Sequence, residues 1–231
     1  LASYTQMLDR VAMIAQTVRT PFIADGDTGY GGLLNVAHAV RGYEAAGASA
    51  IQLEDQVFPK KCGHTPNRRV IPAEDMVRKI RVASDARTSK DFLIVARTDA
   101  RTEHGIDEAL RRAELYGKAG ADILFVESPE SEDEMRTICE RADKPLLANM
   151  VEGGRTPVKS RQVLEQLGYR IAIFPVTALL AATEAMAAAY AALKAQGSSA
   201  GMAQPLYPFS QMSTLMGFQE VWDFEKKYAE D

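Results

Sequence analysis

The sequence predicts an α/β fold of the (β/α)8 TIM-barrel type, and three observations lead to this prediction. Short apolar runs alternate with longer amphipathic stretches, which is typical of βαβ units and a parallel sheet. Polar residues follow every run but the last, and side chains gathered from the ends of many strands are typical of a barrel active site. No Gly-x-Gly-x-x-Gly motif opens a helix after a strand, so the fingerprint of a dinucleotide-binding open sheet is missing.

The predicted strands are short and almost wholly apolar. Such runs are typical of parallel strands whose two faces are both buried. Six of them are present, which falls short of the eight strands of a closed barrel. They cover residues 21–25, 50–55, 92–97, 123–127, 145–149 and 171–175.

Helical patterns fill the stretches between the strands. Gly47, Gly120 and Gly168 follow three of these patterns, and glycine readily takes the left-handed conformation that closes a helix. The predicted helices cover residues 33–46, 73–83, 107–119 and 158–167.

The end of the chain differs from the repeats. An alanine-rich helix is predicted at residues 177–196, and an amphipathic segment at residues 210–228 follows a linker rich in Gly, Ser and Pro. We therefore place a barrel domain at residues 1–196 and a linker with a helical tail at residues 197–231. The tail carries more large apolar residues than a solvated helix tolerates, so we expect it to pack on its own barrel or on a neighbouring subunit.

Composition excludes several classes of protein. Hydrophobic residues make up 46% and charged residues 25% of the 231 positions, which is typical of globular domains. A net charge of −4 gives no general attraction to nucleic acid or anionic lipid, and the apolar runs end before a membrane-spanning length. Two cysteines are too few for a disulfide framework and indicate a reducing compartment, so we expect a cytoplasmic protein. Cys139 is predicted to lie on a buried helix face and to be inert.

Three acidic residues at strand ends are candidate metal ligands. Asp25 and Asp27 are two positions apart on an extended strand end, so both side chains should project to the same side, and Glu54 ends the next strand. Clustered carboxylates without nearby His or Cys suit a hard cation such as Mg²⁺. The alternative is that these residues only cap helices or solvate the rim.

A long segment after the second strand carries the sequence Phe-Pro-Lys-Lys-Cys-Gly-His at residues 58–64. Long loops inside βα repeats are usually functional. Lys60 and Lys61 before Cys62, with His64 after it, would favour the thiolate, which suits a nucleophile or a general acid/base. The alternative is an ordinary loop cysteine.

Further candidates follow the later strands. Arg97, at the end of the third strand, is suited to hold a substrate carboxylate, or it forms an ion pair with Glu54 or Glu127. Glu127 and Asn149 either bind substrate or connect barrel loops.

Five motifs, in chain order, closely resemble the isocitrate lyase/phosphoenolpyruvate mutase superfamily. The likeness extends from residue 1 to about residue 190 and is most specific in the Lys-Lys-Cys-Gly-His loop. The motifs are Asp25–Gly31, Leu53–Gln56, Lys60–His64, Ala96–Ala100 and Asn149–Gly154.

The resemblance implies a set of roles for these residues. Mg²⁺, or Mn²⁺ in its place, is held through Asp25 and Asp27 with Glu54 in its outer shell, and a mobile loop carries Lys60 and Cys62. The implied catalytic residues are Cys62, Lys60, Arg97 and His64, and the implied substrate-binding residues are Arg97, Glu127, Asn149, Gly63 and His64.

The reaction implied is that of an oxo-acid lyase. It cleaves a carbon–carbon bond of a 2-hydroxy-dicarboxylate, of the 2-alkylmalate or methylisocitrate type, to a 2-oxo acid such as pyruvate and a carboxylate. Cys62 matches the residue that protonates the enolate formed on cleavage, whereas the phosphorus–carbon bond branches usually have another residue there. The alternatives are an oxaloacetate hydrolase or decarboxylase, a carboxyphosphonoenolpyruvate-type phosphonate mutase, and a catalytically inactive binding relative.

Departures from the superfamily pattern bear on substrate and assembly. Leu180 stands where methylisocitrate lyases have an Arg, and the tail near Ser210 lacks a second Arg of those enzymes, which favours a dicarboxylate over a tricarboxylate.

The superfamily has two further strands before residue 1 of this chain, so the chain is expected to contain strands three to eight. Members often exchange C-terminal helices, so a homo-oligomer, a dimer or a tetramer, is expected.

Overall fold

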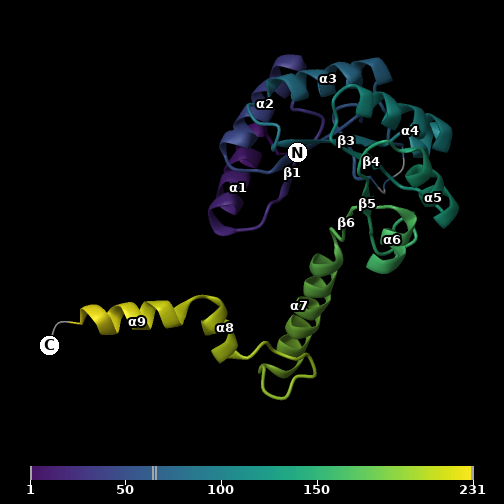
Figure 1. Cartoon of the computed structure of the whole chain (residues 1–231). Helices are drawn as coiled ribbons and strands as arrows, with labels where there is room; N and C mark the ends of the chain where they lie inside the picture. Colours follow the sequence, from purple (N-terminus) through teal and green to yellow (C-terminus); the bar gives the residue numbers. More distant parts are fainter. Residues whose placement is uncertain (1, 64, 66, 230–231) are drawn as a thin grey trace. The chain divides into compact units, whose positions relative to one another are not determined.

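The computed structural model describes residues 2–63, 65 and 67–229. The chain divides into two compact units, Leu1–Val176 and Thr177–Asp231. Strands and helices alternate through the first unit (Figure 1). The numbers of all the predicted site residues fall within this unit.

Six parallel strands make up the described part of the sheet and confirm the predicted runs. β1, β2, β3 and β4 are hydrogen-bonded neighbours in that order, β5 pairs with β6, and a parallel bridge between Leu124 and Leu146 joins the two groups. The strands therefore follow one another in chain order, as they do around a (β/α)8 barrel. They span Ile23–Asp25, Ala50–Glu54, Leu93–Thr98, Ile123–Val126, Leu147–Asn149 and Ile171–Ile173.

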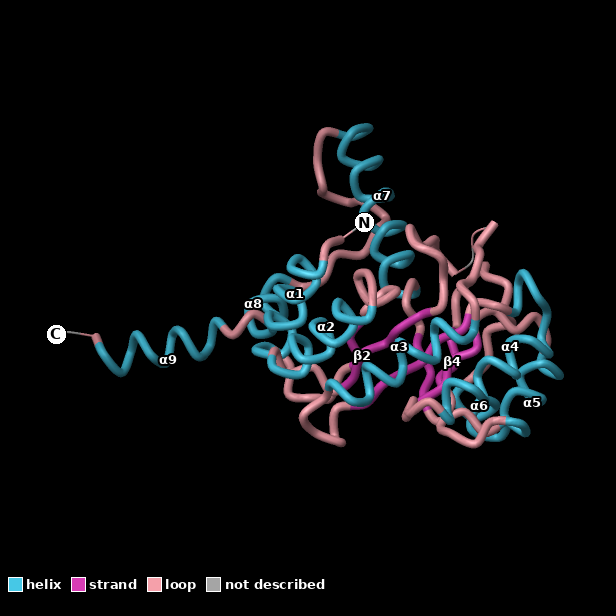
Figure 2. Tube along the Cα trace, turned by 90° about the horizontal axis from the view of Figure 1, so that it is seen from above, coloured by secondary structure: helices cyan, strands magenta, loops and turns pink. Residues whose placement is uncertain are grey.

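Helices cover the outside of the strands, and Figure 2 shows α3 and α4 beside the magenta strands. α5 contains Cys139 and confirms that this residue lies on a helix, although Cys139 is half-buried rather than buried. Ser131 caps α5 by accepting a hydrogen bond from the Glu134 N–H, and the first turn is acidic, which suits a helix N-terminus. α4 begins earlier than predicted and is interrupted at Gly105, whose φ is 83°. The helices of this unit span Tyr4–Thr17 (α1), Leu33–Ala45 (α2), Ala73–Ala86 (α3), Arg101–Lys118 (α4), Glu132–Arg141 (α5) and Arg161–Leu167 (α6).

The core has two parts because strand residues alternate between the two faces of the sheet. The larger part lies between strands and helices and contains Tyr43, Met76 and Tyr116. The smaller part lies on the opposite face, and we call it the inner cluster. It consists of Ala50, Val95, Ile123, Phe125 and Leu147.

The second unit consists of α7 (Thr177–Gln196), α8 (Phe209–Leu215) and α9 (Phe218–Tyr228), and none of the described residues in these helices is buried. The helical tail predicted at residues 210–228 consists of two helices, which are separated at Gly217, where φ takes a left-handed value of 80°. The boundary between the units precedes α7, whereas the predicted domain boundary follows it. α7 is long and apolar enough to cross a membrane by length and composition alone, which corrects the expectation that the apolar runs end before a membrane-spanning length. The core helix of a soluble protein meets the same criterion.

Candidate active site at the carboxyl ends of the strands

Strand alternation places the candidate residues on one face of the sheet. Arg97 follows Val95 of the inner cluster by two positions, so its side chain lies on the same face. The parallel register pairs Glu54 of β2 with Arg97 of β3. The same alternation places Glu127 two residues after Phe125, and Asn149 two residues after Leu147.

The Lys60 ammonium lies among the three predicted metal-binding carboxylates. Its Nζ is 2.7 Å from Asp27 Oδ1 and 3.7 Å from both Asp25 Oδ2 and Glu54 Oε1. Burial lowers the pKa of Lys60, but the three carboxylates outweigh that effect and raise it, so the side chain is an ammonium at neutral pH. The structure thus brings together four of the predicted residues, and a cation already occupies the space between the acids.

The carboxylates fit a hard divalent cation. Both side-chain oxygens of Glu54 are buried and accept no hydrogen bond from any described residue. Burial raises the pKa of Glu54 to about 7, although Arg97 and Lys60 oppose the shift. Within residues 2–63, 65 and 67–229, no three His, Cys, Asp or Glu side chains are grouped so as to hold a metal unaided. Mg²⁺ needs few direct carboxylates, because it keeps several of its ligands as water, so the donor set suits this ion.

Asp25 and Asp27 approach each other through a turn, which corrects the prediction of an extended end. Asp27 has a left-handed φ of 48°, and its backbone N–H donates to Asp25 Oδ1 at 2.9 Å. The Asp27 carbonyl accepts from the Glu54 N–H at 2.9 Å, and the Gly26 N–H donates to the Gln52 carbonyl at 2.8 Å. These bonds attach the turn to β2, so the two aspartates are held near Glu54.

Arg97 is held mainly by a residue that the sequence reasoning missed. Its Nε and Nη2 each donate to the Asp99 carboxylate at 2.9 Å, which is a bidentate pair. The predicted partners are farther away: Nη1 is 3.5 Å from Glu54 Oε2, and Nη2 is 3.4 Å from Glu127 Oε2. Burial lowers the pKa of Arg97, but the three carboxylates raise it well above its ordinary value. The motif at residues 96–100 contains Asp99, but nothing in its spacing indicates which arginine it holds.

Glu127 and Asn149 contact each other. This contact is compatible with both roles expected for them, substrate binding and connection of the barrel loops. The Asn149 amide donates to Glu127 Oε2 at 3.0 Å, and Ser128 Oγ lies 3.0 Å from Glu127 Oε1. The buried Oδ1 of Asn149 accepts no hydrogen bond from the part of the chain that the structure describes. Asn149 therefore retains an acceptor for a ligand donor.

In the loop that follows β2 (residues 57–69), Gly63 lies directly over Arg97. A Cβ atom on Gly63 would be 2.6 Å from Arg97 Nη2, so only glycine fits there without a shift. Cys62, one residue earlier, is exposed, and His64 lies outside the described residues.

Gln56 holds the middle of this loop and was not singled out from the sequence. Its side chain is buried; its Nε2 donates to the Lys61 carbonyl at 3.0 Å, and its Oε1 accepts from the Lys61 N–H at 3.0 Å. This pairing fixes the backbone between Lys60 and Cys62.

Asp55, next to Glu54, has a structural role. It is fully buried on the helix side of the strand end, and burial raises its pKa although several donors oppose the shift. Its carboxylate accepts hydrogen bonds from the Tyr116 hydroxyl (2.7 Å), Thr98 Oγ1 (2.8 Å), the Asp99 N–H (2.9 Å) and Arg112 Nη1 (3.1 Å).

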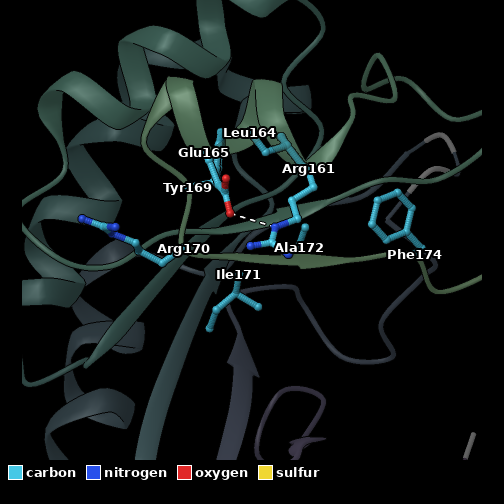
Figure 3. A pocket seen from close by; sticks show the side chains of 8 residues that line it. All are labelled: Arg161, Leu164, Glu165, Tyr169, Arg170, Ile171, Ala172 and Phe174. Carbon is cyan, nitrogen blue, oxygen red and sulfur yellow. Dashed lines mark hydrogen bonds and ion pairs between the residues drawn. The ribbon is translucent and has the colours of Figure 1, made fainter.

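A pocket of about 350 Å³ lies away from these residues, between α6 and β6 (Figure 3). Arg161 and Glu165, which pair at 2.8 Å, form part of its wall together with Tyr169 and Phe174. None of the predicted site residues lines this pocket, so the candidate active site remains at the strand ends, beneath the loop.

Comparison with known proteins identifies the family of the chain. The sequence profile of the family described as phosphoenolpyruvate phosphomutase matches residues 1–194. The chain belongs to this family. The predicted superfamily is therefore confirmed.

Relatives within the phosphoenolpyruvate phosphomutase family include two lyases. A 2,3-dimethylmalate lyase of Eubacterium barkeri is 49% identical over 99% of this chain and 79% of its own length. A 2-methylisocitrate lyase of Aeropyrum pernix is 44% identical over 100% of this chain and 71% of its own. The predicted enzyme class, a lyase, is confirmed at this level.

Solved structures of the family confirm the predicted fold class. A crystal structure of 2,3-dimethylmalate lyase matches with a TM-score of 0.89 and 35% identity over 99% of this chain and 77% of that one. A phosphonopyruvate hydrolase, solved in complex with oxalate and Mg²⁺, matches with a TM-score of 0.84 and 30% identity over 100% of this chain and 80% of that one.

Proposed function

We propose that this protein is a Mg²⁺-dependent carbon–carbon lyase that cleaves a 2-hydroxy-dicarboxylate, of the 2,3-dimethylmalate type, to pyruvate or another 2-oxo acid and a carboxylate. The observation that carries the proposal is the placement of three carboxylates opposite Arg97, beneath the loop that presents Cys62. The 49% identity to a 2,3-dimethylmalate lyase supports the choice of substrate class.

Asp25 and Asp27 would hold the metal ion, with Glu54 beside it. When bound, Mg²⁺ supplies a Lewis acid that lowers the pKa of the substrate hydroxyl and polarises the forming 2-oxo group. Lys60 pairs with these carboxylates, and with a metal ion bound to them its ammonium would be available to the negative charge of a bound substrate.

The remaining groups act on the leaving fragment. Arg97, held in place by Asp99, presents its guanidinium to the fragment carboxylate. The free Oδ1 of Asn149 would accept a hydrogen bond from a donor group of the substrate, such as its hydroxyl. The substrate hydroxyl would lose its proton to solvent as its oxygen forms the 2-oxo group and the neighbouring carbon–carbon bond breaks. The electron pair of that bond stays on the leaving fragment as an enolate, and Cys62 delivers a proton to its carbon, which gives the second carboxylate product. The loop, resting on Arg97 through Gly63, excludes water from the enolate while that proton is transferred.

The proposed substrate preference depends on how many cationic side chains the protein offers to the substrate carboxylates. Leu180 takes the position where an arginine is expected in methylisocitrate lyases, so a third carboxylate lacks that partner. The preferred substrate is therefore a dicarboxylate with alkyl substituents.

A substrate panel tests the proposal. The protein is incubated with Mg²⁺ and 2,3-dimethylmalate, methylisocitrate, isocitrate or oxaloacetate, and 2-oxo acid or acetate release is followed. We expect turnover of 2,3-dimethylmalate to exceed that of the two tricarboxylates. Strong methylisocitrate turnover without dimethylmalate cleavage would overturn the substrate preference, and turnover of oxaloacetate alone would identify the hydrolase or decarboxylase alternative.

We also propose that the protein is a cytoplasmic homo-oligomer without nucleic-acid or membrane partners. Large apolar side chains of α7–α9 are exposed, including Tyr190, Phe209 and Trp222, and a second copy of the chain would cover them. Light scattering after size-exclusion chromatography tests this, because a monomer at micromolar concentration would contradict it. A reducing compartment suits a catalytic thiol at Cys62, which is unpaired.

A further inference from the structure

A buried network joins the second half of the loop to Arg97. Asp99 lies at its centre: its carboxylate receives the bidentate pair from Arg97 and also accepts from Arg68 Nη1 at 2.5 Å. The Arg68 and Asp99 side chains are only 1% and 0% exposed, so neither charge is compensated by water. One carboxylate is therefore shared by the candidate substrate-binding arginine and an arginine of the loop.

Arg68 is fixed at further points beyond Asp99. Its Nη2 donates to Thr102 Oγ1 and lies 3.5 Å from Ser128 Oγ. Ser128 Oγ is also 3.2 Å from the Gly63 carbonyl. Polar contacts thus run from Gly63 through Ser128 and Arg68 to Asp99, which connects the two halves of the loop with the strand that carries Arg97.

The network is costly to break because its members are buried and charged. Burial alone would raise the pKa of Asp99, but Arg97 and Arg68 outweigh that effect and hold the pKa below its ordinary value. If Arg68 is removed, Arg97 is the remaining cation on Asp99, and the loop loses its ion pair to β3. The orientation of Arg97 and the position of the loop are therefore linked.

We propose that Arg68 is a positioning residue of the active site: through Asp99 it holds both the Arg97 guanidinium and the loop bearing Lys60 and Cys62 in their working places. The catalytic part of this proposal rests on the proposed lyase function. Arg68 does not touch the reacting atoms, and its effect is exerted through the carboxylate that it shares.

The test compares Arg68→Met and Arg68→Lys with the matched control Arg69→Met. Arg69 is the adjacent residue and is exposed, so its replacement removes the same charge without opening the network. Steady-state kinetics with 2,3-dimethylmalate and Mg²⁺ give kcat and KM. Limited trypsin digestion of the substrate-free protein, with cleavage after Lys61 measured by mass spectrometry, reports the loop independently of activity.

For Arg68→Met we expect kcat/KM to fall on the order of 100-fold, the effect of displacing a positioned group by about 1 Å. Cleavage after Lys61 should accelerate by about tenfold or more, because local opening becomes easier. Arg68→Lys keeps the charge but lacks the planar fork that reaches both Asp99 and Thr102, so both of its values should be intermediate. Arg69→Met should match the wild type in both measurements.

Unchanged kinetics and unchanged cleavage in Arg68→Met would overturn the proposal, and a fall in kcat/KM without faster cleavage would overturn its loop part. If thermal unfolding shows that Arg68→Met does not fold, Arg68→Lys decides by the same two measurements. If the wild type cleaves no dicarboxylate, the proposed lyase function fails, while the tryptic comparison still supports or overturns the positioning of the loop.

Discussion

Glu54 and Asp55 are neighbouring carboxylates at the end of β2, and replacing each by its amide should change the stability of the fold in opposite directions. Asp55→Asn weakens an acceptor that receives four hydrogen bonds and removes one of the two carboxylates that pair with Arg112, the other being Glu108. Removing one member of a buried ion pair costs about 3–5 kcal/mol. For a domain of this size, roughly 2–4 °C of Tm corresponds to each kcal/mol, so Asp55→Asn should lower Tm by roughly 6–20 °C.

Glu54→Gln removes a buried carboxylate that accepts no hydrogen bond from a described residue. The pKa of Glu54 is raised from 4.5 to about 7, mainly by burial, so the folded metal-free protein retains a proton that the unfolded chain releases above pH 4.5. Ionisation therefore destabilises the fold as pH rises from 4.5 to 7, by about 3 kcal/mol in total. At pH 8 without metal, Glu54→Gln should be more stable than the wild type by about this amount, and at pH 4.5 the two should be nearly equal.

The assay is thermal unfolding of the wild type and both variants in EDTA at pH 4.5, 6 and 8. Addition of Mg²⁺ at pH 8 should raise Tm of the wild type more than that of Glu54→Gln, because the ion compensates the carboxylate charge. Equal losses of Tm in the two variants would refute the distinction between Asp55, whose carboxylate accepts four hydrogen bonds, and Glu54, whose buried carboxylate accepts none from the described residues. So would a stability difference between wild type and Glu54→Gln that does not depend on pH.

Three further predictions concern the metal, the loop and the second cysteine. EDTA should abolish turnover, and Mg²⁺ or Mn²⁺ should restore it. Asp27→Asn should raise the Mg²⁺ concentration for half-maximal activity by about tenfold or more. Full activity in EDTA would contradict a role for the metal. Gln56→Leu should lower kcat by about 30-fold, since it removes two hydrogen bonds to Lys61 of ~1 kcal/mol each, and a wild-type kcat would contradict this. Burial raises the pKa of the Cys139 thiol to about 11, so this thiol should be unreactive at neutral pH. Cys139→Ala should therefore keep kcat within about twofold, and iodoacetamide should still inactivate the variant. Loss of that inactivation would assign the reactive thiol to Cys139.

The arrangement of the site was predictable wherever it follows from strand alternation. Glu54, Arg97, Glu127 and Asn149 each end an apolar run, and parallel neighbours bring such ends to one edge of the sheet. That is why the sequence indicates a common site without any knowledge of loop geometry.

Contacts that depend on the return path of the loop were not predictable. Arg68 meets Asp99 only because residues 57–69 fold back over β3, and Gln56 meets Lys61 for the same reason. No periodicity encodes such a path, because the loop has no repeating hydrogen-bond pattern. The break at Gly217 is different: glycine inside a helical pattern was a visible signal, but the apolar spacing of the tail continues on both sides of it.

The most direct test of the account compares the wild type with Cys62→Ser on 2,3-dimethylmalate in D₂O with Mg²⁺. The wild type should release pyruvate and propionate in equal amounts, with one deuterium on the propionate carbon at which the bond broke. Cys62→Ser should lower kcat by about 100- to 10,000-fold, the usual contribution of a general acid. Turnover that persists in Cys62→Ser, or a wild type that releases no propionate, would contradict the account.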